Sequence, residues 1–267
     1  MTEAAGPALR GSVLGAKRIV VKVGSSSISG ENADQIGPLV DALATTYARG
    51  VEVILVSSGA IATAIPFLNL DGRPTDLATQ QAAAAVGQNV LMWRYQTSLD
   101  RYKILAGQVL LTAGDLENAT PRSNAQRAME RLLGLRILPI VNENDTVATH
   151  EIRFGDNDRL AALVSQLIAA DLLVLLSDVD ALYTRPPSQP GARRIEHVPF
   201  DDDLAGVELG DIGSAGVGTG GAGTKIAAAK LAAASGTPVL FTSTANVAAA
   251  LAGEPTGTWF DAAPGAA

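Results

Sequence analysis

The sequence contains no cysteine and only two histidines, His150 and His197. Without cysteine the chain cannot form a disulfide framework, a thiolate zinc site or a cysteine nucleophile. We interpret both histidines as solvated or structural residues. The absence of disulfides fits a cytoplasmic protein, and the cytoplasm is the location that we expect.

The chain also lacks an excess of positive charge. It carries 20 Lys and Arg against 27 Asp and Glu, which gives a formal net charge of −7. A protein that follows a nucleic-acid backbone needs clustered Lys and Arg to neutralise the phosphates. We therefore expect no nucleic-acid partner, and we interpret the acidic run at 201–203 as a solvated turn.

Long apolar runs are missing as well. The first 17 residues contain no apolar stretch of the length that a signal peptide needs. The most apolar segment, 160–176, is interrupted by Ser165, Gln166 and Asp171, which a membrane span rarely tolerates. We expect no membrane association, a flexible N-terminal tail at 1–16, a single domain at 17–260 and a C-terminal tail at 261–267.

The sequence is rich in short Val, Ile and Leu runs that alternate with longer Ala-rich segments. This alternation predicts βαβ units and an α/β fold with an open, mainly parallel sheet. The predicted strands cover 18–23, 51–57, 103–111, 136–141, 172–176 and 237–241, and the predicted helices cover 33–49, 75–100, 123–133, 158–169 and 224–235. The segment 183–223 departs from this alternation, because it contains four prolines and ends in a glycine-dense stretch. We expect it to form a lobe or lid near the functional site.

Polar residues follow several of the predicted strands, and ligands of an open parallel sheet bind beyond the carboxyl ends of its strands. Lys22 and Gly24 end the first strand and look like a phosphate-facing turn, because glycine lets the backbone approach a ligand closely. The run Ser-Ser-Gly-Ala at 57–60 forms a strand-to-helix junction. Such a junction can hold an anion, for example a carboxylate, although a simple helix cap has the same signature.

Carboxylates and amides follow two further strands. Asn-Glu-Asn-Asp at 142–145 and Asp-Asn-Asp at 156–158 come after one predicted strand, and Ser-Asp-Val-Asp at 177–180 follows the next. Each group alone fits an exposed helix cap. Together they indicate a ligand site at one edge of the sheet.

A glycine-rich segment at 218–223 formally matches G-x-G-x-x-G. It is not a dinucleotide fingerprint, because no strand precedes it and no acidic residue follows about twenty residues later. It is not a Walker A loop either, because Lys225 follows Thr224 and precedes Ile226. We interpret it as a flexible loop that brings Lys225 to the start of a helix, where backbone amides and one lysine can bind phosphate.

Taken in order, these runs resemble the motifs of the bacterial glutamate 5-kinases of the amino acid kinase family. The similar strings are KVGSS at 22–26, SSGAIA at 57–62, QAAAAVGQ at 81–88, VNEND at 141–145, FGDND at 154–158 and TGGAGTK at 219–225. The resemblance extends over residues 17–260 and implies an αβα sandwich. It also implies a glutamate site in the N-terminal half of the domain and a nucleotide site in the C-terminal half.

The resemblance implies roles for single residues. Lys22 and Lys225 are similar to the two lysines that neutralise the transferred phosphoryl group, and Asp158 is similar to the carboxylate that orients both. The implied substrate contacts are Ser58, Gly59, Asn142, Asp145, Asp156 and Asn157. The implied nucleotide-binding residues are Lys22, Gly24, Ser177, Asp178, Thr219, Gly220, Gly221, Ala222, Gly223, Thr224 and Lys225, and no protein ligand to a metal is assigned.

The implied reaction is the phosphorylation of the γ-carboxylate of L-glutamate by ATP with Mg²⁺, the first step of proline biosynthesis. The residue chemistry agrees, because a carboxylate acceptor is already ionised at neutral pH and needs no general base. We expect Asp145 to bind the free ammonium group, since an N-acetylated substrate would leave that carboxylate unpaired. The resemblance also implies a homo-oligomer (a dimer or tetramer), proline as feedback inhibitor and glutamate-5-phosphate reductase as a functional partner.

The chain departs from the family pattern at two places. Family members often carry a bulkier residue, commonly Met, where this chain has Ala222 and Gly223, and many continue into a PUA domain that we expect this kinase domain to lack. Three alternatives are an acetylglutamate kinase, a uridylate kinase and a non-catalytic regulator that binds an amino acid. The motifs contain no arginine cluster for uridylate, and both lysines with Asp158 argue against the regulator.

Overall fold

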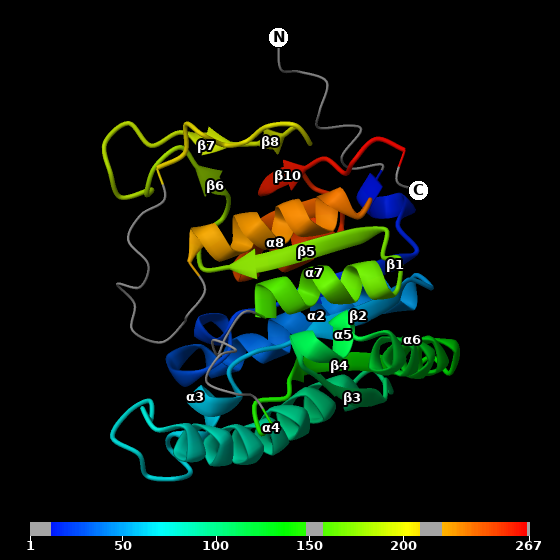
Figure 1. Ribbon diagram of the computed structural model, residues 1–267, viewed down its shortest axis with the longest axis vertical. Helices are drawn as coiled ribbons and strands as arrows, with labels where there is room; N and C mark the ends of the chain where they lie inside the picture. The colour runs from blue at the N-terminus through cyan, green and yellow to red at the C-terminus, as the bar shows by residue number, and fades with distance from the viewer. Residues whose placement is uncertain (1–11, 148–156, 209–220, 266–267) are drawn as a thin grey trace.

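The computed structural model describes residues 12–147, 157–208 and 221–265 (Figure 1). Within these ranges the main sheet has eight strands in the order β3-β4-β2-β1-β5-β9-β10-β8. The strands are β1 (Arg18–Lys22), β2 (Glu52–Val56), β3 (Ala106–Leu111), β4 (Leu138–Glu143), β5 (Leu172–Ser177), β8 (His197–Val198), β9 (Val239–Ser243) and β10 (Thr258–Phe260). Neighbouring strands are parallel except β10, which runs antiparallel to β9. The predicted mainly parallel α/β fold is confirmed.

Helices cover both faces of this sheet. One face packs against α2 (Ile36–Ala48), α4 (Leu77–Asp100) and α9 (Val247–Leu251), and the other packs against α5 (Ala113–Glu117), α6 (Ala119–Gly134), α7 (Asn157–Leu167) and α8 (Ala222–Ala234). In Figure 1, α7 and α8 lie side by side next to β5. The layers form an αβα sandwich. Short 3₁₀ turns and the small helix α3 (Ala60–Ala64) complete the connections.

The central strands are apolar along their whole length because both of their faces are covered. In β1, Ile19 and Val21 pack into the layer of α2 and α4, whereas Val20 packs into the layer of α7 and α8. None of the three is exposed to solvent. Successive side chains of a strand point to opposite faces, so a strand buried on both sides reads as an unbroken hydrophobic run.

The predicted elements differ from the observed ones mainly at their ends and at the edge of the sheet. The sequence pattern places Lys103 and Arg136 in strands, but both have positive φ angles, 56° and 58°, in the turns that leave α4 and α6. The strands β8 and β10 are absent from the prediction, because two or three residues show no measurable periodicity.

The predicted lobe at 183–223 is only partly a separate unit. Within it, β7 (Arg194–Ile195) pairs with β6 (Leu182–Tyr183) as a small antiparallel sheet, but β8 is the edge strand of the main sheet. The ring of His197 in β8 contacts Asp261 at 2.8 Å, which agrees with a structural histidine. The lid interpretation is therefore wrong for β8, and residues 209–220 and His150 lie outside the described residues.

The chain changes direction across the sheet at β1. After β1 it builds β2, β3 and β4 on one side, and α7 then carries it back to β5, which pairs with the other side of β1. The carboxyl ends of β1 and β5 thus border a topological switch point, where open α/β sheets bind their ligands. The first turns of α7 and α8 lie at this edge of the sheet.

Helices α3 and α4 cross in backbone contact. A Cβ atom added at Gly87 of α4 would lie only 1.7 Å from the carbonyl oxygen of Ala60 in α3. Ala83 and Ala84 on the same face of α4 pack against Ile61 and Ala64 of α3. The small side chains of the string at 81–88 therefore let the two helices approach closely.

We expect Gly87→Ala to lower the free energy of unfolding by about 2–4 kcal/mol, because the two backbones must separate. Gly134→Ala in α6 is the matched control. Nothing lies within 4 Å of the Cβ atom added there, so that change should be neutral or stabilise by about 0.5–1 kcal/mol. Urea denaturation of both variants tests this, and equal effects would contradict the contact at Gly87.

Candidate active site

Three charged side chains meet at the switch point, and we call them the ionic centre. Lys22 ends β1, Asp158 lies in the first turn of α7, and Lys225 lies in the first turn of α8. The Nζ atom of Lys22 is 2.5 Å from Oδ1 of Asp158, and the Nζ atom of Lys225 is 3.2 Å from Oδ2. All three are buried, and Asp158 is only 1% exposed.

Two lysines and one carboxylate give the ionic centre a net charge of +1. Burial by itself raises the pKa of Asp158, but the ammonium groups of Lys22 and Lys225 outweigh it and the pKa falls below its ordinary value. The hydroxyl of Thr224 also donates a hydrogen bond to Oδ2 at 2.9 Å. Asp158 is therefore ionised at neutral pH, and it holds two ammonium groups at the switch point.

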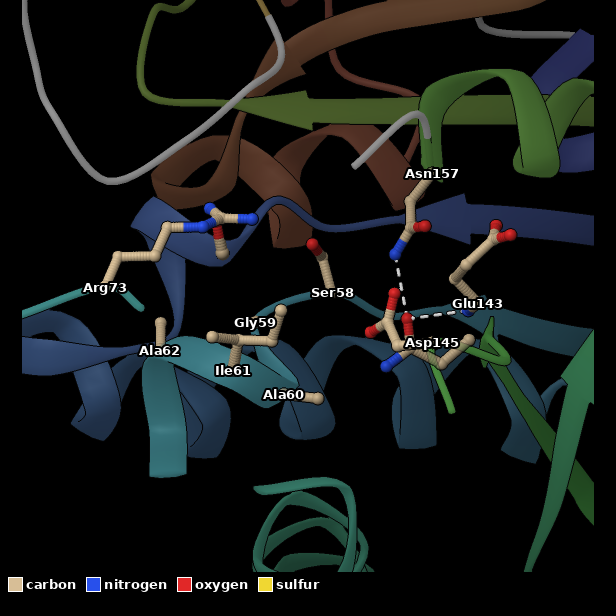
Figure 2. A pocket seen from close by; sticks show the side chains of 11 residues that line it. Ser58, Gly59, Ala60, Ile61, Ala62, Arg73, Glu143, Asp145 and Asn157 are labelled. Atoms are coloured by element: carbon tan, nitrogen blue, oxygen red, sulfur yellow. Dashed lines mark hydrogen bonds between the residues drawn. The ribbon is translucent and has the colours of Figure 1, made fainter. Parts of the chain in front are cut away.

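A pocket opens beside the ionic centre, and we call it the Asp145 pocket (Figure 2). It is lined by Ser25, Ser58, Gly59, Ala60, Ile61, Ala62, Arg73, Asn142, Glu143, Asp145 and Asn157. Asn157 directly precedes Asp158 in α7, so the pocket adjoins the ionic centre.

Gly59 makes the turn from β2 into α3 at the wall of this pocket. Its φ angle is 88°, in the left-handed region that favours glycine. A Cβ atom there would lie 3.2 Å from Cβ of Ser25 and 3.3 Å from its Cα, which is tighter than most real contacts. The glycine thus allows the turn after β1 and the start of α3 to form one wall.

Buried side-chain amides form a chain of hydrogen bonds at the floor of the pocket. Asn142 donates from Nδ2 to Oε1 of Gln88 at 2.7 Å, and its Oδ1 accepts from Nδ2 of Asn157 at 2.8 Å. The same Nδ2 of Asn157 donates to the carbonyl of Ser57 at 2.6 Å. These two acceptors fix the orientation of the Asn157 amide.

The carbonyl oxygen of the Asn157 side chain is left without a partner. This Oδ1 atom is buried and makes no hydrogen bond within the part of the chain that the structure describes. Buried acceptors are nearly always satisfied, so this atom calls for a donor from a ligand. An ammonium group is such a donor.

Asp145 supplies a negative charge to the same pocket. Burial raises its pKa to about 6, and the opposing effect of the Arg73 guanidinium does not cancel the increase. The surroundings of Asp145 therefore do not fully offset the cost of burying its charge. A cationic ligand group would lower that cost.

A second group of predicted residues lies at the end of β5. Ser177 is buried, and its hydroxyl donates to Oδ1 of the exposed Asp178 at 2.9 Å. The 13-residue helix α8 begins nearby at Ala222, with Gly221 as its N-cap and no side-chain capping bond. The helix therefore begins at Ala222, two residues earlier than the predicted start at Thr224, and Ala222 and Gly223 belong to its first turn, where the sequence pattern predicts a loop.

The structure thus groups the predicted residues in three places: the ionic centre, the Asp145 pocket, and the end of β5 with the first turn of α8. Lys22, Asp158 and Lys225 form the ionic centre, and five of the predicted substrate contacts line the Asp145 pocket: Ser58, Gly59, Asn142, Asp145 and Asn157. A Cβ atom added at Gly24 would lie 3.8 Å from Nζ of Lys22, so this glycine borders the ionic centre. Asp156, Thr219 and Gly220 lie outside the described residues.

Sequence reasoning missed two polar residues of the pocket region. Gln88 supports Asn142, and its one signal is a polar side chain on a helix face made of alanines. Arg73 lines the pocket from the connection between α3 and α4, where the sequence has no periodic pattern.

The described ranges contain neither a cluster of metal ligands nor a membrane-spanning helix. No group of three or more His, Cys, Asp or Glu side chains there could hold a metal ion. No helix in these ranges is long and apolar enough to cross a membrane.

Comparison with known proteins assigns this chain to a family. The model described as the amino acid kinase family matches residues 17–243. The chain is 75% identical over 255 residues to the glutamate 5-kinase of Clavibacter michiganensis subsp. michiganensis (strain NCPPB 382), an alignment that covers 96% of this chain and 98% of the other. The chain belongs to the amino acid kinase family, and within it to the glutamate 5-kinases. The glutamate 5-kinase of Leifsonia xyli subsp. xyli (strain CTCB07) is 72% identical over 251 residues, covering 94% of this chain and 93% of the other.

A longer relative and a solved structure of low sequence identity also match. The glutamate 5-kinase of Streptomyces coelicolor is 56% identical over 251 residues, and the alignment covers 92% of this chain but 67% of that one. A structure of carbamate kinase from Giardia lamblia bound to AMP-PNP superposes with a TM-score of 0.67 at 16% identity, covering 93% of this chain and 99% of that one. This similarity shows a shared fold.

The two aspartates of the amino acid kinase site should affect stability in opposite directions. The pKa of Asp145 is raised from 3.8, so its charged form opposes folding above about pH 4, and fully so above about pH 6. Asp145→Asn should therefore raise the free energy of unfolding by about 1–2 kcal/mol at pH 7.5 and have little effect at pH 4. Denaturant titrations at both pH values, without ligands, measure this.

Asp158→Asn is the matched contrast. The pKa of Asp158 is lowered, so its charge stabilises the fold above the ordinary value of 3.8 and is lost in stronger acid. The substitution removes the negative partner of two buried lysines, and we expect a loss of about 3–5 kcal/mol at pH 7.5. A loss of stability in both variants, or in neither, would contradict the charge assignment.

Proposed function

We propose that this protein transfers the γ-phosphoryl group of ATP to the γ-carboxylate of L-glutamate and releases ADP and L-glutamyl 5-phosphate. The single observation that carries the proposal is a buried pair of lysines held by one carboxylate beside a pocket that offers a carboxylate and an unpaired amide oxygen. The identity to glutamate 5-kinases supports this substrate, and the product would enter proline biosynthesis.

The chemistry requires positioning and charge neutralisation, without a base. An oxygen of the γ-carboxylate forms a bond to the γ-phosphorus, and the bond between that phosphorus and the bridging β–γ oxygen breaks. No proton moves, because the acceptor is ionised at neutral pH. Lys22 and Lys225 would neutralise the charge that develops on the phosphoryl oxygens, and Asp158 would hold both lysines in place.

The Asp145 pocket would bind the amino-acid end of glutamate. Its α-ammonium group would lie between the carboxylate of Asp145 and the Oδ1 atom of Asn157, which both call for a donor. An N-acetylated substrate offers no positive charge to Asp145. Ser58, Gly59 and Asn142 would complete the contacts, and we assign Asp156 to the same site from its motif alone.

In the domain at 17–260, the nucleotide would lie over the C-terminal half and glutamate over the N-terminal half. Gly24, Ser177, Asp178 and the first turn of α8 border that side of the ionic centre. The first amides of a helix favour phosphate. Thr219 and Gly220 belong to this proposal by sequence motif. The AMP-PNP bound to the Giardia carbamate kinase, which has the same fold, supports the use of ATP.

Mg²⁺ would accompany the ATP phosphates. The described residues contain no three-ligand acidic cluster, which suits an ion that is held mainly by substrate phosphates and water. When bound, Mg²⁺ would supply further neutralisation of phosphate charge.

The proposal extends to partners that the motif resemblance implies. We propose a homo-oligomer in the cytoplasm, feedback inhibition by proline at the glutamate site, and delivery of the product to glutamate-5-phosphate reductase. The outer face of α4 suits contact between copies: Val86 and Trp93 are exposed there, Trp93 to 65%, and the helix carries no charge from Leu77 to Trp93.

A hydroxylamine trap with purified protein and Mg-ATP tests the reaction, because an acyl phosphate reacts directly to a hydroxamate. We expect product with L-glutamate and little with N-acetyl-L-glutamate. Product with the acetylated acid alone would identify the enzyme as an acetylglutamate kinase. Absence of product with either acid would favour a non-catalytic amino-acid-binding regulator.

Lys22→Met and Lys225→Met should each lower kcat by about 10²–10³, because each removes one preorganised cation from the transition state. Both variants should fold, since Asp158 keeps one lysine partner. Lys230→Met is the control, because Lys230 lies on α8 with Lys225 but outside the ionic centre. Its ammonium donates to the carbonyl of Asp203. A kcat within twofold of wild type in either test variant would remove that lysine from the mechanism.

A further inference from the structure

Glutamate carries three charges, and the proposed site accounts for two of them. The γ-carboxylate would face the ionic centre and the ammonium group would face Asp145. The α-carboxylate also enters the Asp145 pocket and needs a positive partner. Among the described residues that line this pocket, Arg73 is the one cationic side chain, and the other two charged residues, Glu143 and Asp145, are acidic.

Arg73 is placed at the pocket by a short, anchored stretch of chain. The carbonyl of Pro74, the next residue, accepts a hydrogen bond from Nε2 of Gln80 at 2.8 Å. Asp76 caps α4 by accepting from the amide of Thr79 at 2.9 Å. The backbone beside Arg73 is thus tied to the first turn of α4, while its exposed side chain remains able to meet a ligand.

The side chain of Arg73 lies opposite Asp145 across the pocket. Figure 2 shows its guanidinium extending toward Ser58 on one side, with Asp145 and Asn157 on the other. The two charges are near enough for Arg73 to act on the ionisation of Asp145. An α-amino acid has its ammonium and carboxylate groups on one carbon, so it presents opposite charges at close range. The pocket offers the complementary pair.

We propose that Arg73 binds the α-carboxylate of the acceptor and makes the enzyme selective for an α-amino dicarboxylic acid. This inference rests on the proposed function and adds a specificity-determining residue to it. A guanidinium binds a carboxylate through two parallel hydrogen bonds, which a lysine cannot reproduce. Arg73 and Asp145 then recognise the two charges of one substrate carbon.

Three acids that all carry the acceptor carboxylate test whether Arg73 binds the α-carboxylate or acts in another way. L-Glutamate carries all three charged groups, 4-aminobutyrate lacks the α-carboxylate, and glutarate lacks the ammonium group. ADP release is measured for each acid with wild type, Arg73→Gln and Arg73→Lys. An acid that is not turned over is measured as a competitive inhibitor of glutamate.

We expect Arg73→Gln to raise the KM for glutamate by about 10- to 100-fold, the usual effect of losing a charge-assisted hydrogen bond. The kcat at saturating glutamate should stay within about threefold, because the ionic centre is intact. The KM or inhibition constant of 4-aminobutyrate should be unchanged, since it has no group for Arg73. Arg73→Lys should restore part of the affinity for glutamate.

Two variants serve as controls. Arg127→Gln removes an exposed arginine of α6 whose side chain bonds to Asn124 on its own helix, and it should change no constant. Asp145→Asn should show the reverse selectivity, with weaker binding of glutamate and 4-aminobutyrate and unchanged binding of glutarate. Unfolding curves of every variant check that the fold is retained.

Two results would overturn the inference. An unchanged KM for glutamate in Arg73→Gln would remove Arg73 from binding. An equal loss for glutamate and 4-aminobutyrate would mean that Arg73 acts only by keeping Asp145 ionised. Failure of the proposed function is distinct from both, because wild-type protein would then show no turnover of glutamate.

Discussion

The arrangement of the site depends on one buried carboxylate that holds two lysines in the interior. Asp158 comes from α7, and its partners come from β1 and α8, so a single side chain ties together three elements that are far apart in the sequence. A buried ion pair is weak evidence for stability, because desolvation offsets most of the attraction. Two buried lysines held by one carboxylate are therefore better explained by the binding of a ligand than by the needs of the fold.

The neighbouring Asp145 pocket, in contrast, is built mainly from neutral groups. Its floor is a set of neutral amides joined by hydrogen bonds, and amides do not change their charge with pH. Charge enters only at the walls, through Asp145 and Arg73. The division separates the reacting end of the proposed substrate, which would meet the two lysines, from the recognition end, which would meet one charge of each sign.

Much of this arrangement is predictable from the sequence, and the exceptions have physical reasons. The parallel strands read as apolar runs because both faces are covered, and the polar residues after them follow from the rule that ligands bind at strand ends. The edge strands β8 and β10 and the helix α3 are too short to show a period. Gln88 and Arg73 were missed because their roles depend on which side chains the tertiary fold brings near them.

The backbone contact at Gly87 has a consequence for the entropy of binding. Helix α3 has five residues, which is too few to be stable alone, and it carries the wall of the Asp145 pocket. Since α4 meets α3 without an intervening side chain at Gly87, no rotamer change at this point can loosen that wall. Ordering of mobile groups is one of the main costs of association, so a wall fixed before the ligand arrives reduces that cost. The rigidity of the wall depends on the absence of a single methyl group.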